Sequence, residues 1–161
     1  MKRTESKPLF PLFTDISGYK IVIVGGGSVA LRRVRTLLSF ASDLTVVAPK
    51  VRPELEELAE AGRVRLERRP YRREDLYAAQ LVLAATDDRQ VNEDVYSACK
   101  CLGILVNVAS DRRKCDFQFP SVVLKDEISV GITGNGENHR QVKETRKKLE
   151  AYLGGEQIYG E

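Results

Sequence analysis

A glycine-rich segment carries the clearest chemical signal in the chain. Residues 25–30 read Gly-Gly-Gly-Ser-Val-Ala and fit the pattern G-x-G-x-x-G/A. In this pattern the first glycine permits a tight turn, the second lets the backbone approach a pyrophosphate, and Ala30 permits close helix packing. Gly25, Gly26 and Gly27 therefore predict a dinucleotide site in which a helix N-terminus holds the phosphates. Glycines that only make a tight strand-to-helix turn are the alternative.

Such a site needs a strand before the glycines and a helix after them, and the sequence provides both. Residues 20–26 form an uninterrupted β-branched run that ends in glycines, which is typical of a strand buried on both faces. From Val29 onward apolar side chains recur on one helical face, while Arg32, Arg33 and Arg35 fall elsewhere. The glycine loop thus lies between a buried strand and an amphipathic helix.

Strands and helices then alternate, which predicts an α/β fold with a Rossmann-like, doubly wound parallel sheet. After residue 116 the alternation of strands and helices stops, and the sequence predicts a β-hairpin followed by a basic helix. We therefore expect a nucleotide-binding domain of residues 1–116, followed by a smaller segment of residues 117–161. The further expected elements are strands at 44–48, 64–67, 81–86 and 104–108, helices at 54–61 and 88–101, the hairpin at 122–132 and the last helix at 140–152.

Composition narrows the class of protein. The chain has 161 residues, the size of one ordinary domain, and 42% hydrophobic with 30% charged residues is the balance of a folded protein. No run approaches the roughly 20 apolar residues of a membrane span, so we expect a cytoplasmic protein with no membrane partner. A net charge of +3 is too small to predict a nucleic-acid partner. A single histidine, His139, and three cysteines expected to be reduced predict no metal site.

Polar residues also follow the expected strands. Thr86 ends the strand expected at 81–86 and Asp87 follows it, and ligands of open parallel sheets bind beyond such ends. Asp88 comes next, and capping the following helix is a competing role for it. After the strand at 44–48 the usual ribose-binding Asp or Glu is missing and Lys50 stands nearby. Lys50 is either a contact to a 2′-phosphate or a solvated lysine, so NAD and NADP both stay open.

Several short motifs stand in register between about residue 8 and residue 150. They are Pro8-Leu9-Phe10, Val24–Ala30, Val46–Pro49, Ala84–Asp88 with Asn92, Val106–Val108, Cys115–Pro120 and Arg146–Glu150. Together they resemble the precorrin-2 dehydrogenase family, the dehydrogenase and ferrochelatase part of siroheme synthase. The resemblance implies NAD-dependent oxidation of precorrin-2 to sirohydrochlorin, a step toward siroheme and, in some organisms, haem. It also implies a homodimer in which about residues 117–150 pair or swap with the partner.

The resemblance also assigns site residues. The family's nucleotide contacts fall on Ser28, Val29, Pro49 and Lys50, with Thr86 and Asp87 flanking the nicotinamide. Substrate contacts are expected at Asn107, Phe119 and Pro120. The resemblance implies that members of the family commonly continue into a helical domain, and we expect residues 117–161 to contain only the dimerisation segment.

One departure from the family concerns the general base. The family usually has an aspartate three residues after the asparagine of the fifth strand, and here that place is Ser110, with Asp111 next. A serine without a nearby histidine is a poor base, whereas a carboxylate partly shielded from water can be tuned toward neutrality. We therefore expect the catalytic position at Ser110 and Asp111, with Asp111 as the base.

Three functions compete. In the first, precorrin-2 gives a hydride to NAD+ and a proton to a base or to water. In the second, the chain is a sirohydrochlorin ferrochelatase, in which a carboxylate or cysteine helps to deliver iron. In the third, it is a non-catalytic module that binds a dinucleotide and regulates a partner. The glycine loop alone fits the third, whereas the motif at 115–120 and the basic helix favour the enzyme.

Overall fold

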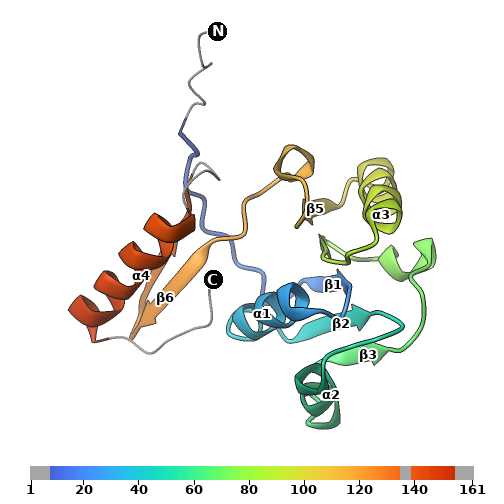
Figure 1. Ribbon diagram of the computed structural model, residues 1–161, viewed down its shortest axis with the longest axis horizontal. Helices are drawn as coiled ribbons and strands as arrows, with labels where there is room; N and C mark the ends of the chain where they lie inside the picture. The colour runs from blue at the N-terminus through green and yellow to red at the C-terminus, as the bar shows by residue number, and fades with distance from the viewer. Residues whose placement is uncertain (1–7, 135–138, 155–161) are drawn as a thin grey trace, which may run out of the picture. The chain divides into compact units, whose positions relative to one another are not determined.

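The computed structural model describes residues 8–134 and 139–154, and the chain divides into two compact units. The larger unit is Asp15–Phe119 (Figure 1). The smaller unit begins at Pro120 and also includes the segment before Asp15. The division lies after Phe119, not after residue 116 as expected, because Phe117 and Phe119 pack against the core of the larger unit.

A five-stranded sheet in the order β3-β2-β1-β4-β5 forms the centre of the larger unit, and every strand pair is parallel. Three α-helices and the short 3-10 helix η1 connect these strands, and a second 3-10 helix, η2, follows the last of them. Their bounds are β1 Lys20–Val24, α1 Ser28–Leu37, β2 Asp43–Val47, α2 Pro53–Glu60, β3 Arg65–Glu67, η1 Arg73–Leu76, β4 Leu81–Ala84, α3 Arg89–Leu102, β5 Leu105–Val108 and η2 Arg112–Lys114. The predicted Rossmann-like α/β fold is confirmed.

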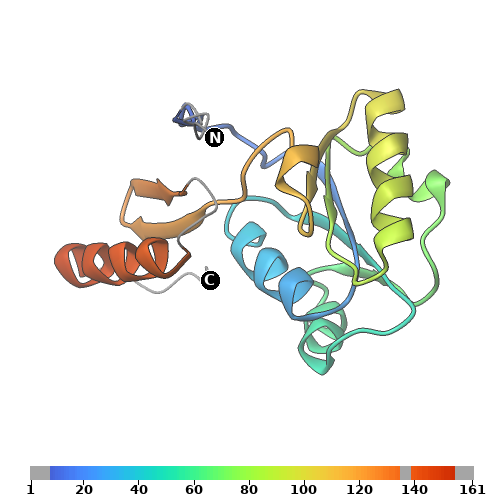
Figure 2. The same ribbon diagram turned by 45° about the horizontal axis from the view of Figure 1, so that its top comes forward.

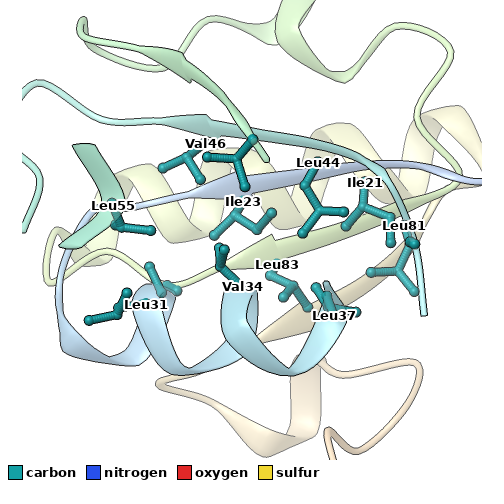
Figure 3. Packing of buried hydrophobic residues seen from close by; sticks show 14 residues of the cluster. Ile21, Ile23, Leu31, Val34, Leu37, Leu44, Val46, Leu55, Leu81 and Leu83 are labelled. Carbon is teal, nitrogen blue, oxygen red and sulfur yellow. The ribbon is translucent and has the colours of Figure 1, made fainter. Parts of the chain in front are cut away.

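Both faces of this sheet are covered, which explains why its strands read as continuous apolar runs. Successive residues of β1 point to opposite faces, so Ile21 and Ile23 join one core while Val22 and Val24 join the other. The first core lies beneath α1 and α2 (Figure 3), and the second lies beneath α3 and η1. Figure 2 shows α3 on the side of the sheet opposite to α1 and α2.

Helix α3 has a defined start and end. The Asp88 carboxylate accepts hydrogen bonds from the backbone N–H of Gln90 at 2.8 Å and of Val91 at 3.1 Å. Gly103 ends the helix in the left-handed conformation, with φ of 68°. The competing role of Asp88 as a helix cap is therefore confirmed.

The smaller unit contains the predicted hairpin and basic helix. Strands β6 (Ser121–Lys125) and β7 (Ile128–Ile132) pair antiparallel, and α4 (His139–Leu153) packs against β6. Val122 and Val123 of β6 are both buried. Across the described part of the chain, no helix combines the length and the apolar character needed to cross a membrane.

Candidate functional site

The glycine loop turns sharply because its first two residues lie against neighbouring backbone. Gly25 has φ of +126°, and a Cβ there would overlap the carbonyl group of Ala85 at the end of β4. A Cβ on Gly26 would overlap the carbonyl oxygen of Lys50 in the loop after β2. The Arg52 N–H also donates to the Gly26 carbonyl at 2.9 Å. The segments expected to hold the cofactor, after β1, β2 and β4, therefore meet at one end of the sheet.

The N-terminus of α1 is open to an anion. Gly27 is the N-cap residue, no side chain caps the helix, and the first turn contains no acidic residue. Gly27 and Ser28 are exposed, and nothing in the described chain lies within 4 Å of where a Cβ on Gly27 would be. The first backbone N–H groups of a helix lack internal partners, and the helix dipole adds positive potential there. This end of α1 therefore fits the pyrophosphate of a dinucleotide.

The loop after β2 presents Pro49 and Lys50 to solvent. Two residues further on, the Arg52 guanidinium donates to both carboxylate oxygens of Glu54, at 3.0 and 3.2 Å. The hydrogen bond from Arg52 lowers the pKa of Glu54, so the two side chains form a complete ion pair. Arg52 is exposed but paired with Glu54, and Lys50 is a second exposed cation in this loop beside the glycine turn.

Thr86 and Asp87 form the loop after β4. The Thr86 hydroxyl accepts a hydrogen bond from the Asp88 N–H at 3.1 Å, which makes a compact turn. Asp87 is exposed, and its carboxylate lies 3.4 Å from the Thr86 hydroxyl. Because Asp88 is used as the cap of α3, Asp87 is the acidic side chain that this turn offers to a ligand.

Asn92 connects the ends of β4 and β5. It is only 3% exposed, and its side-chain nitrogen donates to the Thr86 carbonyl at 2.9 Å and to the Ser110 hydroxyl at 3.3 Å. The motif that includes Asn92 was recognised in the sequence, but no role was predicted for it. A signal was present, because Asn92 falls on the same helical face as the apolar residues Val95 and Cys99.

Asp111 does not have the environment expected of it. Its carboxylate caps η2 and accepts hydrogen bonds from the Arg113 guanidinium at 3.2 Å and from the Arg113 N–H at 3.0 Å. These bonds lower the pKa of Asp111, whereas the sequence predicted a carboxyl tuned upward, toward neutrality. The expectation was wrong because a local basic residue outweighs the slight burial.

The side chains of Asn107 and Phe119 contact other residues of the larger unit. Asn107 is 3% exposed, and its oxygen accepts from the Arg33 guanidinium at 2.5 Å while its nitrogen donates to the Phe117 carbonyl at 2.8 Å. The guanidinium also lies 5.1 Å from the centre of the Phe119 ring. No hydrogen bond joins Asn107 to Ser110 or Asp111 in the described chain. Pro120 begins the smaller unit.

Cys115 and Asp116 lie along β5. The Asp116 carboxylate accepts from the Val106 N–H at 3.0 Å, and the Asp116 N–H donates to the Val106 carbonyl at 2.8 Å. The Cys115 sulfur lies 3.3 Å from both the N–H and the carbonyl oxygen of Val108, and burial raises the pKa of this thiol. Nowhere in the residues that the structure describes do three His, Cys, Asp or Glu side chains gather in a group that could hold a metal ion.

Comparisons with known proteins agree with this geometry. Residues 12–121 match a family described as "Putative NAD(P)-binding". The precorrin-2 dehydrogenase of Bacillus subtilis (strain 168) is 32% identical over 92% of this chain and 91% of that protein. The chain belongs to the precorrin-2 dehydrogenase family.

Further proteins are similar to this member of the precorrin-2 dehydrogenase family. A solved structure named "SirC, precorrin-2 dehydrogenase" superposes with a TM-score of 0.80 at 28% identity, covering 89% of this chain and 70% of that one. The siroheme synthase of Nitrosococcus oceani is 35% identical over 93% of this chain. A "Probable multifunctional siroheme biosynthesis protein HemA" of Ruminiclostridium josui is 40% identical over 87% of it. The chain spans only 32% and 27%, respectively, of those two longer proteins.

Proposed function

We propose that this chain oxidises precorrin-2 to sirohydrochlorin with NAD+ as the acceptor. The observation that carries the proposal is the meeting of three strand ends around the open N-terminus of α1, in a chain that covers 91% of the Bacillus subtilis precorrin-2 dehydrogenase. One ring carbon of the substrate gives up a hydride, and one proton is released. The products are sirohydrochlorin, NADH and a proton, so the electrons balance.

The residues of the glycine loop bind the dinucleotide in this proposal. When bound, the nicotinamide supplies hydride acceptance, and the protein supplies position. The N–H groups of Ser28 and Val29 would hold the pyrophosphate, and Thr86 and Asp87 would flank the nicotinamide. NAD is favoured over NADP because a 2′-phosphate is commonly met by an arginine, and Arg52 is already paired with Glu54.

Asp111 is the proposed proton acceptor. Its lowered pKa, caused by Arg113, keeps the carboxylate ionised at neutral pH and therefore able to accept a proton. The same lowered pKa makes it a weak base, so the proton passes on to water and does not remain on the protein. Asn107, Phe119 and Pro120 stay as proposed substrate contacts. The buried contacts of Asn107 and Phe119 favour a role in shaping the substrate wall.

The smaller unit is proposed to pair with a second copy of the chain. A two-stranded sheet with one helix buries little apolar surface by itself. Ile128 on β7 is 55% exposed and Tyr152 on α4 is 85% exposed, and a partner would cover such side chains. Light scattering after size exclusion tests this, and a monomer at micromolar concentration would contradict it. We also propose a cytoplasmic location, which suits three unpaired cysteines.

The deciding experiment is anaerobic conversion of enzymatically generated precorrin-2 in the presence of NAD+ or NADP+. NADH and sirohydrochlorin should appear together and in equal amounts, and more slowly with NADP+. Iron insertion into sirohydrochlorin without any nicotinamide would instead support the chelatase. Dinucleotide binding with no tetrapyrrole binding would support the regulatory module.

A further inference from the structure

The side-chain amide of Asn92 holds together the two loops that carry the proposed reaction. Its nitrogen donates to the Thr86 carbonyl at 2.9 Å and to the Ser110 hydroxyl at 3.3 Å. Thr86 follows β4 and Ser110 follows β5, and these two strands are neighbours in the sheet. One buried side chain in the first turn of α3 thus sets the spacing between the nicotinamide side and the base side of the site.

The directions of these hydrogen bonds follow from their partners. A carbonyl oxygen can only accept, so the nitrogen of the Asn92 amide must face Thr86. The second N–H of the same nitrogen points to the Ser110 oxygen, which therefore accepts. The proton of the Ser110 hydroxyl has no acceptor in the described part of the chain, and Ser110 is exposed. Ser110 is thereby arranged to donate its proton outward.

The Asn92 oxygen supports a role beyond packing. This atom is buried and has no hydrogen-bond partner among the described residues. An unpaired buried polar atom is unfavourable, and a side chain retained only for packing would avoid it. The arrangement is explained if the nitrogen end of the amide is what the protein needs.

We propose that Asn92 is a positioning residue that holds the Ser110 hydroxyl as a hydrogen-bond donor to a carboxylate of the tetrapyrrole substrate. This inference rests on the proposed function and deepens it. It gives Ser110, which stands where the family usually has an aspartate, the task of binding the anionic substrate and leaves proton acceptance to Asp111. A hydroxyl donor suits a substrate carboxylate, because a hydrogen bond to an ionised acceptor is stronger than one between neutral groups.

The sharpest test is Asn92→Asp, which keeps the shape of the side chain. The new carboxylate, when ionised, can only accept, so it takes the proton of Ser110 and removes it from the substrate. We expect Asn92→Asp and Ser110→Ala each to lower kcat/KM for precorrin-2 by about 10- to 100-fold, the value of a hydrogen bond to a charged group. The double variant should be no worse than either single variant, because both remove the same interaction.

Two controls separate positioning from folding. Ser110→Thr keeps the hydroxyl and should retain most of the activity. Gln90→Ala removes another side-chain amide from the first turn of α3, but an exposed one, and should change nothing. Asn92→Asp activity should also recover partly at lower pH, since the protonated carboxyl regains a donor. Thermal melting of every variant shows whether the fold is kept.

The same variants are measured for sirohydrochlorin binding by fluorescence quenching, which needs no turnover. The inference is overturned if the fold-losses in kcat/KM, or the fold-losses in sirohydrochlorin affinity, of the two single variants multiply in the double variant. It is also overturned if Ser110→Ala behaves like the wild type. If the wild-type chain binds sirohydrochlorin with the expected coupling but does not oxidise precorrin-2, the proposed function fails and the inference stands. A wild-type chain that neither oxidises nor binds a tetrapyrrole overturns both.

Discussion

The Asp111 carboxylate is held by Arg113, which donates to it from both its side chain and its backbone N–H. The pair forms within two residues, at the cap of a 3-10 turn. It fixes the charge of Asp111 at neutral pH, because the hydrogen bonds stabilise the ionised carboxylate. A base of this kind accepts a proton briefly and does not store one.

This pair makes the pH dependence of turnover testable. Because the pKa of Asp111 is lowered, the acid limb of kcat should lie below the ordinary aspartate range in the wild-type chain. Arg113→Ala removes the side-chain donors, so the pKa should rise and the acid limb should move to higher pH. Arg112→Ala, the neighbouring exposed arginine, is the matched control. An unchanged limb in Arg113→Ala would remove Asp111 from the mechanism.

A charge placed at the N-terminus of α1 should separate binding from folding. Gly27→Asp meets open space, so it should keep the fold and raise the free energy of unfolding by roughly a few tenths of a kcal/mol through capping. The new carboxylate occupies the free N–H groups and repels a phosphate, so dinucleotide affinity should fall at least tenfold, to be read by calorimetry. Gly18→Asp, also in open space, is the control. Undiminished affinity in Gly27→Asp would place the pyrophosphate elsewhere.

The adjacent carboxylates of Asp87 and Asp88 should affect different properties, one the activity and the other the stability of the protein. Asp88→Ala removes the cap of α3 and should lower the free energy of unfolding by about 1 kcal/mol, measured by urea denaturation. Asp87→Ala should leave stability unchanged and lower kcat/KM with NAD+, because its exposed carboxylate is the one offered to the ligand. If the two variants exchanged these effects, the assignment of the turn would be wrong.

The cofactor preference should depend on Glu54. Glu54→Ala releases Arg52 from its ion pair, which provides a cation for a 2′-phosphate beside Lys50. The ratio of kcat/KM for NAD to that for NADP should therefore fall in this variant. Glu56 lies in the same helix as Glu54 and forms an ion pair with Arg68. Glu56→Ala releases Arg68 from that pair and serves as the comparison. Equal ratios in both variants would show that Arg52 plays no part in the preference.

The sequence predicted the parts of the fold and site that depend on local pattern. Buried strands, the glycine turn and the cap at Asp88 each follow from residues close together in the chain. The position of Asn107 in the fifth strand was read correctly, but its partner Arg33 is 74 residues away and no periodicity indicates it. The pKa of Asp111 was misjudged for a different reason. The prediction considered only the shielding of the Asp111 carboxyl from water. The hydrogen bonds that Arg113 donates to it depend on the conformation of a short turn, which the sequence does not indicate.

The segment at Cys115 and Asp116 has a consequence for assembly. β5 is the outermost strand on its side of the sheet, and Asp116 pairs with both the N–H and the carbonyl of Val106. An outer strand with unpaired backbone groups invites addition of a foreign strand, and this is how many proteins aggregate. Here the chain shields its own sheet edge at Val106 and Val108. Strand-by-strand growth of the larger unit is thereby blocked on that side, even before any ligand binds.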